Sequence, residues 1–153
     1  LTNKMKVLSL RYGENFAPPC GTMSAHKSLI STYGFAWYGK FGCPISKKVV
    51  TQVMNEKPAR VLFIKSGTSE RYWAEIEAIT RQRPEERFIP EYYRFMVSKV
   101  KCWIKIKRIY VAPHNIMSQC VVVSSGMPLS IASKASMNPC LLVECIEATK
   151  NVE

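Results

Sequence analysis

The sequence contains no aspartate, and its eleven acidic residues are all glutamate. Two-metal nuclease sites, Mg²⁺-phosphate sites and Ser-His-Asp arrangements usually draw on aspartate, so these enzyme classes lose support, although glutamate-based variants stay open. No acid falls between Glu91 and Glu144, whereas the same stretch carries Arg94, Lys99, Lys101, Lys105, Lys107, Arg108 and Lys134. Such a one-sign stretch predicts an anionic partner, most commonly nucleic acid. The alternative is a basic domain whose lysines only keep it in solution.

Metal-ligand spacing is also missing. The six cysteines form no CxxC pair, and neither His26 nor His114 has a cysteine at metal-ligand spacing, so we expect no zinc and no other cofactor. Cys120 precedes three valines, where a reduced thiol packs as a small apolar residue. This predicts an intracellular protein, cytoplasmic or in the nucleoid or nucleus. No apolar run reaches the roughly 20 residues that span a bilayer, so no membrane partner is expected.

The length fits one domain over residues 1–153, because 47% hydrophobic residues provide material for one core. Lys and Arg number 22 against 11 Glu, and the difference gives a net charge of +11. The chain starts at Leu1 without methionine, which suggests that it is processed or cut from a longer protein.

Hydrophobic periodicity predicts a mixed domain. Alternating or short apolar runs predict strands at 6–12, 60–66, 72–80, 102–112, 120–124 and 140–146. Ser46 is the expected N-cap of a helix whose buried stripe is Val49, Val50, Val53 and Met54. Shorter helical segments are expected at 26–31, 90–93 and 129–133. The sum is an α+β fold, a small curled mixed β-barrel of six or seven strands with two or three flanking helices.

Residues 33–42 combine five aromatic residues with three glycines, a density that disfavours a smooth helix. We interpret this segment as a loop that offers Trp37 and Tyr38 to a base, since stacking contributes about 1–3 kcal/mol per base. The alternative is that Phe35, Trp37 and Phe41 point inward as ordinary core.

Other residues are candidates for the same site. Ser66-Gly67 and Ser124-Ser125 follow apolar strands, where they either donate to a base edge or phosphate or simply form turns. Tyr92 and Tyr93 offer further stacking surface beside the basic stretch. The expected phosphate-contacting residues are Lys40, Lys65, Lys99, Lys101, Lys105, Lys107, Arg108 and Lys134. A solvated lysine is the alternative for each one taken singly.

The order of the segments HKSLI, GFAWYGKFG, a helix, RVLFIKSG, RYWAEIEAI, CWIKIKRIYVAP and VVVSSG resembles the PUA-like superfamily, and within it the EVE and YTH group. The resemblance spans residues 7–144 and implies a curled barrel that holds a modified or flipped base in an aromatic cage. It matches Trp37 to the first cage aromatic and Ser66-Gly67 to the turn at the pocket. The second cage aromatic falls at 92–95, where Tyr and Phe replace the Trp of the YTH pattern. A modified cytosine therefore fits no worse than methylated adenine.

Three functions follow as expectations. The leading one is a non-catalytic reader of a modified cytosine or methylated adenine in DNA or RNA, alone or within a larger effector. Resemblance to the related ASCH branch implies instead a hydrolase of modified nucleosides that uses Lys27, Ser28 or Ser24, and Glu75 or Glu77. The third is an RNA-associated interaction module without a base pocket, in which Trp37 is buried core.

Overall fold

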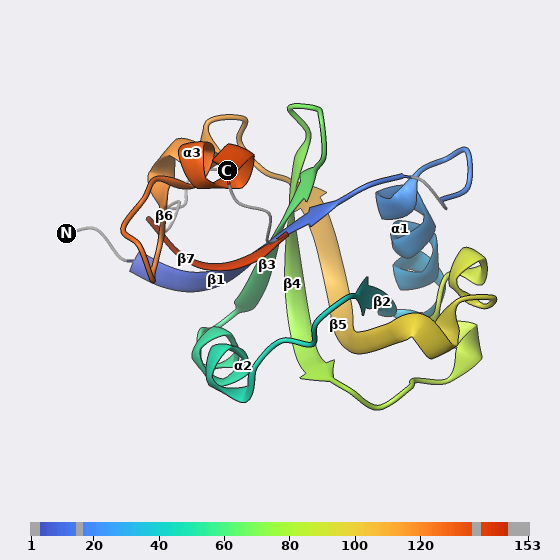
Figure 1. Ribbon diagram of the computed structural model, residues 1–153. Helices are drawn as coiled ribbons and strands as arrows, with labels where there is room; N and C mark the ends of the chain where they lie inside the picture. Colours follow the sequence, from blue (N-terminus) through green and yellow to red (C-terminus); the bar gives the residue numbers. More distant parts are fainter. Residues whose placement is uncertain (1–3, 15–16, 136–138, 147–153) are drawn as a thin grey trace.

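A computed structural model describes residues 4–14, 17–135 and 139–146 (Figure 1). The strands are β1 (Lys4–Tyr12), β2 (Ala36–Phe41), β3 (Ala59–Lys65), β4 (Arg71–Thr80), β5 (Val100–Val111), β6 (Cys120–Val122) and β7 (Cys140–Ile146). The α-helices are α1 (Thr22–Tyr33), α2 (Lys47–Met54) and α3 (Leu129–Ala135). Four 3₁₀ turns complete the described elements: η1 (Glu86–Phe88), η2 (Glu91–Tyr93), η3 (Val97–Lys99) and η4 (Ile116–Gln119).

All seven strands form one curled sheet in the order β2-β5-β4-β3-β1-β7-β6 (Figure 1). Only β1 and β3 pair in parallel, and the other neighbours are antiparallel. The sheet does not close, so β2 and β6 are its edges. This confirms the predicted α+β class and the mixed, curled sheet with flanking helices.

The local signals in the middle of the chain are also confirmed. Ser46 caps α2 by accepting a hydrogen bond from the Val49 backbone N–H at 3.3 Å, and Val53 is fully buried. The predicted strands at 60–66 and 72–80 are β3 and β4, which form an antiparallel hairpin. Among the described residues, no helix is both long enough and apolar enough to cross a membrane.

The central strands bury both faces, because successive side chains of a strand point to opposite sides. On one face, Leu8 and Phe63 pack with residues of α1 and α2. On the other face, Val7 and Leu62 pack with Trp73 and with Leu129 of α3. The sheet is therefore the middle layer, and these two hydrophobic cores lie between it and its helices.

The segment 33–42 differs from the prediction, because most of it is a strand and not a loop. β2 pairs with β5 along Ala36–Phe41. Glycine is tolerated here since Gly39 lies under the ring of Trp103, which packs directly on the backbone of β2. Trp37 and Tyr38 are consecutive strand residues and so point to opposite faces.

The faces of β5 also differ from simple alternation. The register between β4 and β5 shifts twice near Ile76, as at a β-bulge. In consequence Ile106 and Ile109 pack on the same core, whereas Tyr110 contacts the core on the other face. Trp103 and Ile109, which simple alternation would put on one face of β5, therefore lie on opposite faces.

The expectation of a reduced Cys120 is wrong as well. Cys120 and Cys145 lie opposite each other on β6 and β7, and they form a disulfide. The apolar neighbours of Cys120 do not predict its redox state, because a cross-strand pair brings two buried sulfurs together whatever surrounds them. Cys102, by contrast, is a buried thiol within the core under α1.

We expect Gly39→Ala to destabilise the fold by about 1–3 kcal/mol, because an added Cβ would lie 3.0 Å from Trp103 Cζ3 and 3.1 Å from Val100. Urea unfolding monitored by tryptophan fluorescence measures the change. Gly13→Ala is the matched control, since nothing lies within 4 Å of a Cβ added there. Equal free energies of unfolding for the two variants would contradict the close packing at Gly39.

Candidate nucleic-acid interface

A cavity of about 250 Å³ lies where the ends of β1 and β2 meet the start of α1 and the turn η2. Its aromatic lining consists of Tyr12, Tyr38, Phe41, Tyr92 and Tyr93, and we call it the tyrosine cavity. Pockets for drug-sized molecules span roughly 300–1,000 Å³. The tyrosine cavity is therefore suited to one planar ring system and not to a larger ligand.

The rings are arranged at close range around Tyr93. Tyr92 stacks on Tyr93 with centroids 4.5 Å apart, whereas Tyr38 meets it edge-on at 6.3 Å. Burial raises the pKa of Tyr12, Tyr38, Tyr92 and Tyr93. These phenols stay neutral, so they offer ring faces and hydroxyl groups to a ligand without adding negative charge.

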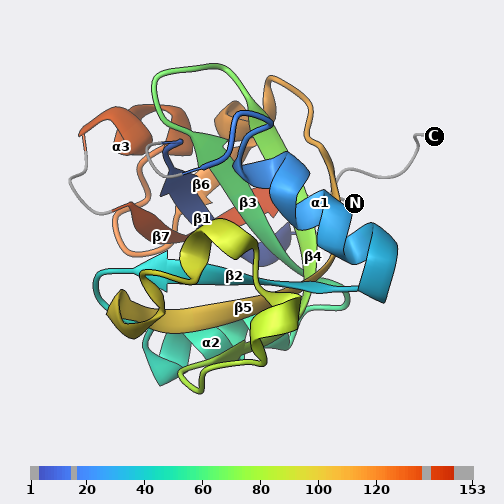
Figure 2. The same ribbon diagram turned by 90° about the vertical axis from the view of Figure 1, so that its right-hand side faces the viewer.

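One hydrogen bond anchors η2 at the sheet edge. The Tyr93 hydroxyl donates to the Gly39 carbonyl oxygen of β2 at 3.2 Å, and both groups are buried. Figure 2 shows the yellow-green segment that holds η1, η2 and η3 lying beside β2 and β5. The position of Tyr92 and Tyr93 in the cavity thus depends on the backbone of β2.

Two cations also line the tyrosine cavity. Lys40 is only 7% exposed, and its Nζ donates to the backbone oxygens of Cys43 at 2.6 Å and Phe41 at 3.3 Å. Arg11 is half-buried, and its Nη1 donates to the Ser133 carbonyl oxygen at 2.8 Å. Among the described residues, none of those that line this cavity is acidic. The cavity is therefore aromatic and cationic.

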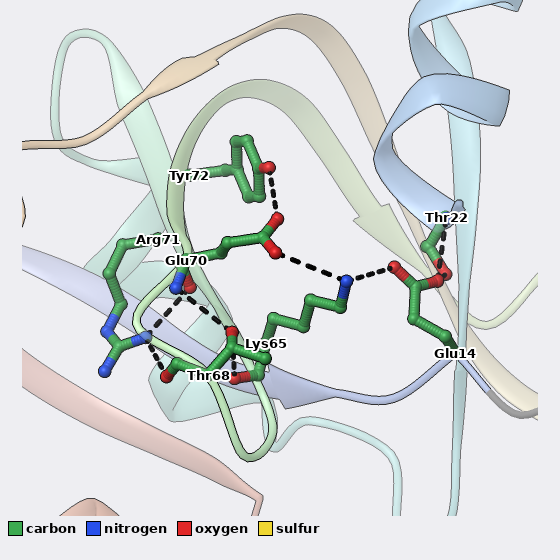
Figure 3. A network of polar contacts seen from close by, with 7 residues as sticks. All are labelled: Glu14, Thr22, Lys65, Thr68, Glu70, Arg71 and Tyr72. Carbon is green, nitrogen blue, oxygen red and sulfur yellow. Dashed lines mark hydrogen bonds and ion pairs between the residues drawn. The ribbon is translucent and has the colours of Figure 1, made fainter. Parts of the chain in front are cut away.

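A polar network holds the start of α1 against the sheet (Figure 3). The Glu14 carboxylate accepts hydrogen bonds from the Thr22 backbone N–H at 2.8 Å and from its hydroxyl at 2.6 Å. Lys65 bridges Glu14 to Glu70, with 3.4 Å to each, and the Tyr72 hydroxyl donates to Glu70. Burial works to raise the pKa of Glu14, but the bonds from Thr22 outweigh it and lower that pKa. Thr22, which lines the tyrosine cavity, is fixed in this way.

The structure brings four predicted residues to the tyrosine cavity: Tyr38, Tyr92, Tyr93 and Lys40. Trp37 is not among its lining residues; it is half-buried and packs with Trp103 on the opposite face of β2. Ser66 and Gly67 line a separate cavity, and Ser124 and Ser125 are exposed in the turn after β6.

Sequence reasoning missed Tyr12, Phe41 and Arg11. The first two are aromatic residues that end β1 and β2, and Arg11 is the neighbour of Tyr12. Their place at strand ends was the available signal, because ligand sites gather where strands give way to loops.

The predicted phosphate-contacting residues fall into two groups. Several pair with carboxylates: Lys65 with Glu14 and Glu70, Lys105 with Glu77 at 3.5 Å, and Arg108 with Glu75 at 3.6 Å. Lys99, Lys101, Lys107 and Lys134 are exposed, as is the paired Arg108. Lys40 is the exception, since it is buried at the tyrosine cavity.

The residues of the alternative hydrolase are not assembled. Lys27 of α1 lies over the ring of Tyr72, with Nζ 5.7 Å from its centroid, on the face under α1. Trp73 and, two residues further, Glu75 point to the opposite face, where Glu75 pairs with Arg108. Ser24 and Ser28 are exposed on α1. Within the described residues, no group of three His, Cys or Glu could hold a metal ion.

Comparison with known protein families identifies the family of the chain. A model of the Pua-like family matches residues 8–138. The chain belongs to the Pua-like family. Pua-like domains generally bind RNA or other nucleic acid, so membership of this family suggests a nucleic-acid-binding domain. No curated protein matches the chain, and no solved structure does.

Behind the tyrosine cavity lies a buried histidine that gives this Pua-like domain a pH-dependent stability. His26 is fully buried, with its ring 5.4 Å from Tyr38 and 5.9 Å from Tyr93, and Nδ1 donates to the Thr22 carbonyl oxygen at 2.8 Å. Burial lowers the pKa of His26 to about 4. The folded state therefore holds the neutral ring, whereas the unfolded chain takes up a proton near pH 6.5.

We expect this difference to contribute stability above about pH 6.5 that is lost as the pH falls toward 4, by about 3 kcal/mol in total. Urea unfolding between pH 7 and pH 4.5 measures the loss. His26→Phe removes this contribution, so its stability should fall less over the same range. His114→Gln is the control, because His114 is exposed. If His26→Phe and the wild type lost the same free energy, His26 would not be the responsible group.

Proposed function

We propose that this Pua-like domain is a non-catalytic reader that binds one modified nucleobase of DNA or RNA in the tyrosine cavity. The observation that carries the proposal is the composition of that cavity: five aromatic side chains and two cations, with no acid among the described residues that line it, around about 250 Å³. A base is planar and fits a space of this size, and the phosphates attached to it favour cationic surroundings.

The energetics favour a base that is easily extruded. Flipping a base out of a duplex costs a few kcal/mol, and least for a base that is damaged, mismatched or already unpaired. Stacking on an aromatic ring contributes about 1–3 kcal/mol per base. Tyr92 and Tyr38 together offset the cost of flipping, so either a single strand or a flipped duplex base is an acceptable ligand.

Lys40 favours a base that carries a carbonyl oxygen. Its Nζ lies beside the rings and donates to the backbone oxygens of Phe41 and Cys43, and no acidic residue lines the cavity within the described part of the chain. A carbonyl oxygen is a strong acceptor for this group, and cytosine carries one whereas adenine does not. A base made cationic by methylation is repelled. Modified cytosine is therefore the favoured ligand, ahead of methylated adenine.

We expect Tyr92→Ala to weaken binding of a single-stranded oligonucleotide with one 5-methylcytosine by about tenfold or more, because a stacking ring is lost. Fluorescence anisotropy in moderate salt measures the affinity, with the unmodified oligonucleotide alongside. Phe95→Ala is the control, since Phe95 is 95% exposed and outside the tyrosine cavity. Equal and weak affinity of the wild type for modified and plain oligonucleotides would remove the reader function.

We also expect Lys40→Met to weaken binding of the 5-methylcytosine oligonucleotide by about tenfold, since a hydrogen bond to a charged group contributes about 1.5–3 kcal/mol. Binding of an N6-methyladenine oligonucleotide should change less. Lys47→Met is the matched control, because Lys47 is exposed at the start of α2. An equal loss for both oligonucleotides would show that Lys40 does not select the base.

A further inference from the structure

A second cavity, of about 460 Å³, opens at the same end of the sheet, beneath α3. Its floor is a row of three residues on neighbouring strands: Arg11 on β1 lies opposite Ile64 on β3, which lies opposite Arg71 on β4. Residues that pair in this way point to the same face of a sheet. Strands are roughly 4.8 Å apart, so the two arginines leave the sheet about 10 Å apart, on either side of Ile64. We call this the arginine cavity.

The walls of the arginine cavity are rich in hydroxyl groups and cations. Thr68 follows β3, Ser118 belongs to η4, and Ser130 and Ser133 belong to α3. Lys134 and His114 also line it, and both are exposed. Within the described part of the chain, none of the residues that line the arginine cavity is acidic. Hydroxyl and guanidinium donors around an acid-free space match the oxygens of a phosphate.

Backbone oxygens orient Arg71 without neutralising it. Arg71 Nη1 donates to the carbonyl oxygens of Thr68 and Glu70, at 2.9 Å each (Figure 3). No carboxylate within the described residues forms an ion pair with Arg71, in contrast to Lys105 and Arg108. The guanidinium group of Arg71 is thus held in place and still carries its charge toward a ligand.

Arg11 connects the two cavities, because it lines both. β7 begins at Cys140, opposite Leu10, so the last two residues of β1 extend beyond this neighbour. There Tyr12 packs in the core under α1 and lines the tyrosine cavity, whereas Arg11 shares the row with Ile64 and Arg71. A polynucleotide that passes this strand end can place a base in the tyrosine cavity and its phosphate backbone in the arginine cavity.

We propose that the arginine cavity binds a phosphate of the polynucleotide whose base occupies the tyrosine cavity. This inference rests on the proposed function, since it assumes a base there. The phosphate has two sources, a phosphodiester within the chain or a terminal phosphomonoester, and the chemistry of recognition is the same for both.

The test compares Arg71→Gln and Lys134→Gln with Lys48→Gln, a matched change of charge on the exposed face of α2. The probe is a single-stranded oligonucleotide with one central 5-methylcytosine, titrated at several salt concentrations. Each cavity variant should lower affinity by about tenfold and reduce the slope of log K against log salt by about 0.7–0.9. The ratio of affinities for modified and plain oligonucleotides, and binding of the free nucleoside 5-methylcytidine, should not change.

Chemical changes to the probe identify the source of the phosphate. A neutral methylphosphonate next to the modified base should weaken wild-type binding, but not binding to Arg71→Gln, if a phosphodiester is bound. Removal of a 5′-phosphate from the probe should weaken wild-type binding, but not binding to Arg71→Gln, if a terminal phosphate is bound. Either result supports the arginine cavity.

The proposal is overturned if Arg71→Gln and Lys134→Gln lose no more affinity than Lys48→Gln. Lys134 is exposed, so its variant keeps the test decisive even where loss of the Arg71 hydrogen bonds unfolds the turn. Failure of the base reader gives a different result: Tyr92→Ala would then bind like the wild type while the cavity variants still lose affinity and salt dependence.

Discussion

The tyrosine cavity depends on the contact between Gly39 and Trp103. Because Gly39 has no side chain, the indole packs on the backbone of β2, and a Cβ there would lie only 3.0 Å from the ring. The carbonyl oxygen of the same residue accepts the hydrogen bond from the Tyr93 hydroxyl. One backbone position thus fixes the sheet edge, the turn η2 and the ring on which Tyr92 stacks. A larger residue would displace all three together.

The distribution of charge along the chain is not its distribution in space. The acid-free stretch includes β5, but β4 lies beside it and supplies Glu75 and Glu77, which pair with Arg108 and Lys105. The arginine cavity gathers cations from β1, β4 and α3, namely Arg11, Arg71 and Lys134, together with Lys65 of β3, which pairs with Glu14 and Glu70. Sheet pairing decides which charges are neutralised, and that pairing joins residues far apart in the sequence. Net charge therefore predicts the class of partner and not the surface that meets it.

Most elements of the fold could be predicted because each has a local signal. Ser46 predicts α2, alternation predicts β1 and β4, and a short apolar run predicts β3. The site could be predicted only in part: Tyr38, Tyr92, Tyr93 and Lys40 line the cavity, whereas Trp37 does not. Which of Trp37 and Tyr38 faces the cavity depends on the alternation of side chains along β2. The glycines of 33–42 predict a loop, for which no such alternation can be assigned. The bulge near Ile76 and the Cys120–Cys145 disulfide are decided by pairing across the sheet, for which a single sequence carries no local signal.

In the proposed complex, the end of β1 lets one strand contact both the base and the phosphate of a nucleotide. Tyr12 and Arg11 are consecutive, and the pleat sends their side chains to opposite faces. One is a neutral aromatic ring in the tyrosine cavity, and the other is a cation in the floor of the arginine cavity. A nucleotide has the same two parts, a planar base and a charged phosphate, separated by a sugar. β3 pairs with this strand end on one side, and on the other side β7 begins only opposite Leu10. Base and phosphate would therefore reach Tyr12 and Arg11 from the two faces of the sheet.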